Sequence, residues 1–267
     1  MHTSALTTAE IEGRCGFFPS FYAPALPTPG MLEQLWRQTL TAYLDNPLPA
    51  VFKEQLFAYL SRLRSCAYCV VCHSCELREL GLSSREIFDL LEPLLGSAPS
   101  SAAHLIGGAE PLAQWPLAGS QEEARIIGLA AHAFMKDEVA EPCLAELRRL
   151  LGQSDYTRLV ILLSHIGGCH DWVQAHPEIA YQDDELVLRH LQGLVRDEPR
   201  LSELFDGHSR GSGLARRDHL AAIVESADDA IIGETLEGTI VSWNGAAERL
   251  YGYSAEMVLG MSISMLV

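Results

Sequence analysis

The chain has 267 residues, 48% of them hydrophobic and 20% charged, a composition typical of a folded protein rather than a disordered one. Its 19 lysine and arginine residues against 35 aspartate and glutamate residues give a net charge of −16, which argues against nucleic acid or an anionic membrane as a partner. No apolar run reaches the roughly 18 residues of a membrane span, and the first residues do not form a secretory signal. We therefore expect a cytoplasmic protein with no nucleic-acid and no membrane partner.

Residues 1–30 are expected to form an irregular arm, because four prolines between Pro19 and Pro29 cannot continue a helix. Residues 31–204 show helical periodicity and no convincing strand, which predicts an all-α domain. Residues 98–119, rich in proline, glycine, serine and alanine, are expected to connect two helical halves. The expected helices are 31–44, 51–63, one capped by Ser65 and ended by Gly81, one starting at Ser83 or Ser84, then 121–135, 141–151, 155–173 and 183–204.

After a linker at 205–217, the pattern changes to a short α/β segment. The β-rich runs 230–232 and 239–243 predict a hairpin, and Asn244 is expected to cap a helix ending near Tyr251, with a second short helix from Ser254 to Gly260. Residues 223–267 resemble the opening of a PAS domain, in the stretches 223–232, 238–244 and 247–254.

This resemblance implies that residues 218–267 are the N-terminal part of a truncated PAS domain, joined to the helical domain through a helix at about 215–226. It also implies a piece of a longer signalling protein with an output domain downstream. Because the missing half would build most of the ligand pocket, these residues give no argument for cofactor binding there.

Four of the seven cysteines fall within ten residues: Cys66, Cys69, Cys72 and Cys75. Without a signal for export, this crowding favours redox or metal chemistry over structural disulfides. A Cys-x-x-Cys pair at a helix N-terminus favours a thiolate, because free backbone N–H groups and the helix dipole stabilise the negative charge.

On a helix, His73 shares a face with Cys66 and Cys69 and can accept or return a thiol proton. A carboxylate is needed to orient this imidazole. Glu54, on the preceding helix, can supply it only if the chain bends near residues 64–65.

Glu54, Cys66, Cys69 and His73 form the pattern Glu-x11-Cys-x2-Cys-x3-His, which resembles the signature of the AhpD-like alkylhydroperoxidase and carboxymuconolactone decarboxylase superfamily. The resemblance implies an AhpD-like all-α fold with two related halves over residues 31–204, assembled as a trimer or hexamer. Tyr68 stands where the best-known relatives place a further relay histidine.

By position, the resemblance makes Cys69 the thiolate that attacks a hydroperoxide and Cys66 the proton donor that then resolves the sulfenic acid as a disulfide. Glu54 and His73 would relay protons, and a thiol or dithiol reductant would restore the pair. Two functions follow: a thiol-dependent peroxidase or disulfide-exchange domain coupled to the PAS module, or a non-catalytic redox-sensing or oligomerisation module of a signalling protein. A decarboxylase acting on a lactone acid is less favoured, because that branch does not depend on paired cysteines.

Other interpretations of the cysteines remain open. They could be buried apolar residues, Cys69 to His73 matches the Cys-x-x-Cys-His haem-attachment pattern, and four cysteines could hold zinc or an iron–sulfur cluster if the helix unwinds. We expect no bound metal or cofactor. A second cluster, His165, Cys169, His170 and Asp171, is expected to line or cap the core beside the close-packing pair Gly167-Gly168.

Overall fold

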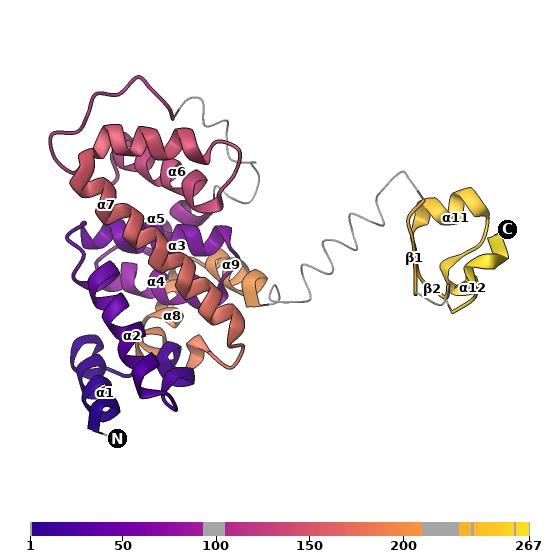
Figure 1. The fold of residues 1–267 in the computed structure, drawn as a ribbon, viewed down its shortest axis with the longest axis horizontal. Helices are drawn as coiled ribbons and strands as arrows, with labels where there is room; N and C mark the ends of the chain where they lie inside the picture. The colour runs from indigo at the N-terminus through magenta and orange to yellow at the C-terminus, as the bar shows by residue number, and fades with distance from the viewer. Residues whose placement is uncertain (1, 93–104, 210–229, 236–237, 259, 267) are drawn as a thin grey trace. The chain divides into compact units, whose positions relative to one another are not determined.

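The computed structural model describes residues 2–92, 105–209, 230–235, 238–258 and 260–266 (Figure 1). The chain divides into two compact units, Met1–Ser209 and Arg210–Val267. The regular structure described in the first unit is helical, which agrees with the expected helical domain. No helix within the described ranges is both long enough and apolar enough to cross a membrane.

The helices of the first unit follow in the order α1 (His2–Cys15), η1 (Ser20–Ala25), α2 (Pro29–Thr39), η2 (Leu40–Leu44), α3 (Ala50–Leu63), α4 (Ala67–Glu79), α5 (Ser84–Leu91), α6 (Gln121–Met135), α7 (Ala140–Ala175), η5 (Tyr181–Asp183), α8 (Glu185–Asp197) and α9 (Arg200–Ser209). The segment η1 and the segment η5 are 3-10 helices, whereas η2 is a π-helical turn.

The prediction of an irregular arm over residues 1–30 is wrong. The prolines begin only at Pro19, so the residues before them are free to form α1. Its fully buried Ile11 joins a cluster with Tyr22, Leu32 and Trp36, and this cluster fixes the N-terminal segment against α2.

The turn between α3 and α4 differs from the predicted cap. Ser65 lies in the left-handed region, with φ of 55°, and Cys66 rather than Ser65 is the N-cap residue of α4. The Cys66 N–H donates to the carbonyl oxygen of Ser61 at 2.9 Å, which closes the turn. The bend expected near residues 64–65 is therefore present, and it allows α4 to pack back along α3.

Of two predicted helix boundaries in the second half, one is confirmed and one is wrong. The residues expected to form helices at 141–151 and 155–173 lie in α7, which is broken at Gly152 as expected, since its φ of 68° and ψ of 175° are non-helical and suit glycine. The single helix expected at 183–204 is two helices, because Pro199, which has no amide hydrogen to donate, separates α8 from α9.

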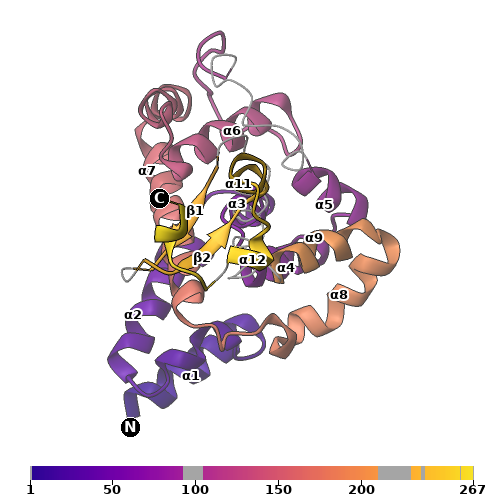
Figure 2. The same ribbon diagram turned by 90° about the vertical axis from the view of Figure 1, so that its right-hand side faces the viewer.

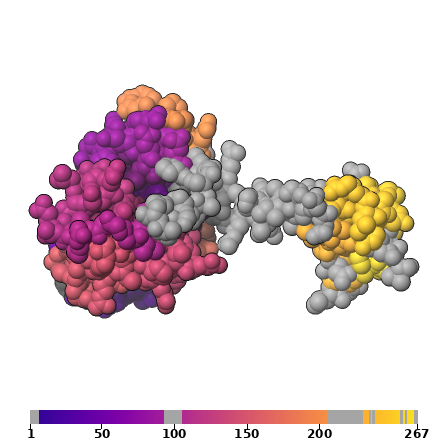
Figure 3. All heavy atoms as spheres, turned by 90° about the horizontal axis from the view of Figure 1, so that it is seen from above, coloured from indigo at the N-terminus to yellow at the C-terminus, as the bar shows by residue number. Residues whose placement is uncertain are grey.

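Helix α4 lies between two apolar cores. One face contributes Tyr68 and Cys69 to a core shared with α3, α6 and α7, and the other contributes Val70 and Leu77 to a core shared with α5, α8 and α9. Figure 2 shows α8 and α9 next to α4, with α6 and α7 on the other side of the unit. The surface in Figure 3 divides in the same way, with the orange C-terminal helices next to purple residues and the magenta and salmon residues opposite.

The second unit contains an antiparallel pair, β1 (Ile232–Glu234) and β2 (Ile240–Trp243), followed by α11 (Gly245–Tyr251), α12 (Ala255–Val258) and η6 (Ile263–Leu266). The Asn244 side chain accepts a hydrogen bond from the Ala247 N–H at 3.0 Å, as expected of an N-cap. The expected hairpin and cap are therefore confirmed. The helix predicted at 215–226 lies outside the described residues, as do parts of the two predicted connections.

Candidate functional site

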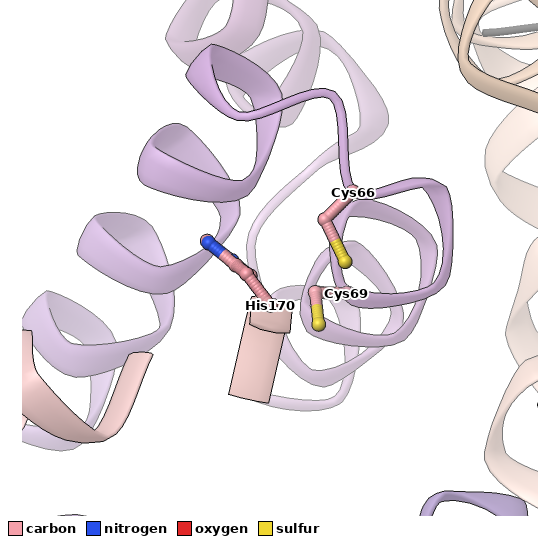
Figure 4. A group of neighbouring side chains, drawn as sticks. All are labelled: Cys66, Cys69 and His170. Atoms are coloured by element: carbon pink, nitrogen blue, oxygen red, sulfur yellow. The ribbon is translucent and has the colours of Figure 1, made fainter. Parts of the chain in front are cut away.

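Two thiols lie at the start of α4, where Cys66 is the N-cap residue and Cys69 belongs to the first turn (Figure 4). Both are free, buried cysteines. Cys66 is 8% exposed to solvent and Cys69 is 2% exposed. A ring nitrogen of His170, from α7, lies within 4.8 Å of both sulfur atoms, which are themselves within that distance of each other. The described site therefore joins two helices that are far apart in the sequence.

The two thiols differ in acidity. Hydrogen bonds from the Cys69 thiol and amide to the Cys66 sulfur lower the pKa of Cys66, assisted by the positive charge of Arg64, although burial opposes them. Burial raises the pKa of Cys69 well above its usual value, and its interaction with Cys66 adds to this. The negative charge of the pair is thus favoured on Cys66, the cysteine to which the family resemblance gives the proton-donating role.

His73 reaches toward α3 and does not belong to the group formed by the two sulfurs and His170. Its Nδ1 lies 2.7 Å from Oε2 of Glu54, so the expected contact between these two residues is present. The imidazole stacks on Phe57 with ring centroids 3.6 Å apart, and the Tyr43 hydroxyl donates to Oε1 of the same carboxylate. Tyr43, Glu54 and His73 form a hydrogen-bonded chain in which Glu54 is buried and the other two residues are partly buried.

The π-helical turn η2 places Tyr43 in this chain. Buried Lys53 donates from Nζ to the carbonyl oxygens of Tyr43, Leu44 and Asn46, at 2.5, 3.3 and 3.0 Å. These bonds satisfy carbonyl groups at the end of the turn and fix its position against α3.

Glu76 lies three residues beyond His73 on α4. Burial raises its pKa to about 7, and the charge of Glu54 contributes in the same direction. A carboxyl group with such a pKa exchanges protons near neutral pH, so Glu76 is a second acid–base group beside the relay. The sequence pattern did not single it out.

His170 was expected to line or cap the core, and it is indeed buried, at 3% exposure. Its position beside the dithiol was missed. Its Nε2 lies 2.8 Å from the Ser61 hydroxyl, whereas its Nδ1 has no hydrogen-bond partner among the described residues. Burial lowers the pKa of His170 to about 3, so the imidazole is neutral at physiological pH. The dense spacing of His165, Cys169 and His170 was the one sequence signal that could have indicated it.

The other two cysteines of α4 belong to different surroundings. The Cys72 thiol lies 3.8 Å from Oδ2 of Asp184, a buried carboxylate that also accepts a hydrogen bond from Tyr68 at 2.5 Å. Burial raises the pKa of Cys72 well above its usual value and that of Cys75 to about 12. Both are therefore protonated thiols, and the continuous α4 does not gather all four cysteines around one ion.

A hollow of about 360 Å³ lies against α7, with a mostly apolar lining that includes Leu35, Trp172, His165 and Cys169. Burial lowers the pKa of His165 to about 4, and its Nε2 lies 3.5 Å from the Cys169 sulfur. Burial also raises the pKa of Cys169, and the charge of Cys66 adds to this effect; Cys169 lines the hollow, whereas Cys66 and Cys69 do not.

Comparison with known proteins gives one family match, in which residues 218–267 match the model of the PAS fold. No solved structure matches the chain. The resemblance of the C-terminal segment is thus confirmed, and a PAS fold suggests a sensory role. The chain combines a mostly helical unit, carrying a Cys-x-x-Cys pair, with a C-terminal PAS fold.

Proposed function

We propose that the helical unit is a thiol-dependent redox domain that reduces hydroperoxides through Cys66 and Cys69 and informs the PAS segment of its oxidation state. The observation that carries this proposal is the hydrogen-bonded thiol pair at the N-terminus of α4, with the pKa of Cys66 lowered. A thiolate beside a second thiol is the arrangement that cycles reversibly between dithiol and disulfide.

In the proposed reaction, the Cys66 thiolate attacks the terminal oxygen of the hydroperoxide. The S–O bond forms as the O–O bond breaks, and the leaving alkoxide takes a proton from the acid–base groups of the site. The Cys69 sulfur then attacks the sulfenic acid of Cys66, water leaves with the Cys69 proton, and a disulfide forms. The two thiols are oxidised by two electrons, and the hydroperoxide is reduced to an alcohol and water.

The chain formed by Tyr43, Glu54 and His73 supports the proton transfer. Glu54 orients the imidazole through the 2.7 Å contact, and His73 lies one helical turn beyond Cys69. The roles of Glu54 and His73 are thus kept as the AhpD-like resemblance implies, while the attacking and resolving roles of the two cysteines are exchanged.

The apolar hollow beside Cys169 supports an organic hydroperoxide as the substrate, since its lining suits a hydrocarbon group better than a small polar peroxide. A thiol or dithiol reductant would restore the pair. A homo-oligomer, trimer or hexamer, an output domain downstream of the PAS fold and a cytoplasmic location complete the proposal.

The test compares hydroperoxide consumption by the wild type, Cys66→Ser and Cys69→Ser in the presence of a dithiol reductant. We expect turnover in the wild type and its loss in both variants. In Cys69→Ser a dione reagent should trap a stable sulfenic acid at Cys66, whereas Cys66→Ser should give little trapping. Cys75→Ser, on the same helix but in the other core, is the matched control and should retain turnover.

Trapping mainly at Cys69 in Cys66→Ser, with none at Cys66 in the other variant, would restore the cysteine roles that the family resemblance implies. Undiminished turnover in both single variants would refute the dithiol mechanism.

The second candidate is a redox sensor that is oxidised once without turnover. The low exposure of the two cysteines, 8% and 2%, favours it, because a reductant thiol has little access to a disulfide formed there. Stoichiometric oxidation that persists with excess dithiol would support the sensor, and sustained consumption would support the peroxidase.

A further inference from the structure

We propose that the reduced Cys66 and Cys69 bind a zinc ion together with His170, leaving a fourth coordination position open. This site goes beyond the proposed peroxidase or sensor function and does not depend on it. Two sulfurs and one imidazole nitrogen form one of the ligand sets that zinc takes in proteins.

The geometry needs only small adjustments. The two sulfurs and a ring nitrogen of His170 all lie within 4.8 Å of one another, and the ring nitrogen not occupied by Ser61 is Nδ1. In a tetrahedral zinc site with Zn–S distances of roughly 2.3 Å, the sulfurs stand roughly 3.8 Å apart. The ligands come from two packed helices, with Cys66 and Cys69 at the start of α4 and His170 on α7 (Figure 4).

His170 supplies the second, independent observation. It is only 3% exposed, and its Nδ1 has no hydrogen-bond partner among the described residues. Leaving a buried polar atom unpaired costs roughly 1–3 kcal/mol, so such an atom calls for an explanation. A metal ion bound at Nδ1 would provide one.

The other nitrogen of His170 has the partner that a metal-binding histidine usually has. Its Nε2 lies 2.8 Å from the buried Ser61 hydroxyl, which fixes the orientation of the ring. Ser61 itself is held in place at the end of α3, where its carbonyl oxygen accepts the Cys66 N–H. Ser61 therefore connects two of the ligands: its side chain contacts the ring of His170, and its carbonyl oxygen contacts the backbone of Cys66.

Neighbouring groups favour these three ligands over others. His73 is hydrogen-bonded to Glu54, and Cys72 is hydrogen-bonded to Asp184, so neither residue is counted among the zinc ligands. Soft sulfur and nitrogen donors without a carboxylate disfavour magnesium and calcium. Two thiolates also balance the charge of a divalent ion in a buried position.

The experiment uses the full chain, reduced with a phosphine, stripped with a chelator and kept free of oxygen. It is titrated with cobalt(II), whose thiolate charge-transfer band and intense ligand-field bands report tetrahedral coordination, and then with zinc. We expect one cobalt ion per chain, displaced by zinc, and the release of protons on binding.

Four variants make the proposal falsifiable. Cys66→Ser and His170→Ala should weaken zinc binding by more than 100-fold, and Ser61→Ala, which keeps every ligand, should weaken it about 10- to 100-fold. Cys75→Ser is the control and should bind as the wild type does. Circular dichroism verifies that each variant is folded. Cobalt spectra without a thiolate band, or unchanged affinity in folded His170→Ala, would overturn the zinc site.

Discussion

Cys66 and Cys69 are three residues apart, yet their sulfur atoms meet different surroundings. Cys66 stands at the N-cap, where the Cys69 amide and thiol donate to it, while Cys69 lies inside the first turn and is almost fully buried. Spacing predicted the cysteine pair, and the need for a carboxylate beside His73, together with the AhpD-like resemblance, predicted the contact between Glu54 and His73. Spacing could not predict which thiol ionises, because that depends on hydrogen bonds and burial supplied by the folded chain.

Glu76 gives a prediction for stability against pH. Its folded pKa of about 7 lies above the ordinary value of 4.5, so between these values the folded chain holds a proton that the unfolded chain has released. The free energy of unfolding contributed by this group is therefore full below pH 4.5 and falls as the pH rises through 7.

We expect Glu76→Gln to lack this fall and to gain about 2 kcal/mol relative to the wild type at pH 8, allowing for partial contact with water. Urea unfolding at several pH values measures it. Glu203→Gln, an exposed site on α9, removes the same charge and serves as the control. Parallel pH profiles for the wild type and Glu76→Gln would contradict the prediction.

Asp184 gives a prediction for the packing of the N-terminal segment. Its carboxylate accepts from the partly buried Ser20 N–H at 2.7 Å and from the buried Tyr68 hydroxyl, so Asp184→Ala removes one acceptor from both donors. We expect a loss of about 3 kcal/mol in the free energy of unfolding, measured with urea. Asp183→Ala, at the exposed neighbouring position, should change it by less than about 0.5 kcal/mol.

At the scale of helices and strands, the sequence predicted the type of each element better than its first and last residues. Apolar periodicity located α3 and α6, a proposed cap at Ser65 and the stop at Gly81 located α4, and cap residues located the start of α5 and α11. The break at Pro199 was missed because the helical periodicity was extended past this proline. The helix before Pro19 was missed because the helix-breaking effect of the prolines from Pro19 to Pro29 was extended to the residues that precede them. His170 was missed because the contact joins positions about a hundred residues apart, which no local pattern encodes.

The capping box of α5 gives a prediction at this scale. The Ser83 side chain accepts from the Glu86 N–H at 3.2 Å, and the Glu86 carboxylate accepts from the Ser83 N–H at 2.8 Å. We expect Ser83→Ala to cost about 1 kcal/mol of stability, measured by thermal unfolding. The double variant with Glu86→Ala should cost less than the sum of the two single variants; strict additivity would show that the two halves of the box act independently.

At the scale of the whole molecule, every residue of the dithiol site belongs to the unit Met1–Ser209. The second unit, with a two-stranded sheet, contributes none of them. The division into a helical unit and a PAS segment was predictable because the change from helical to strand periodicity is local. How one unit reports to the other has no local signature.

We therefore expect residues 1–209 expressed alone to retain the helical content and the Cys66 alkylation rate of the full chain. Circular dichroism and the rate of modification by an alkylating reagent measure these properties. The Cys66→Ser variant of the shortened chain is the control for the reacting thiol. A large loss of helix or a changed rate would show that the second unit supports the site.

The π-helical turn η2 has a consequence for how this chain can change in evolution. A π-turn arises when one residue is inserted into an α-helix, which rotates the residues on either side by about 100° relative to each other. Deleting one residue within Leu40–Leu44 would restore ordinary helix and turn the Tyr43 hydroxyl away from Glu54. Substitutions in this turn at positions other than Tyr43 can preserve the hydrogen bond between Tyr43 and Glu54, whereas the deletion of one residue cannot. Chain length in this turn is therefore under a tighter constraint than the identity of most of its side chains.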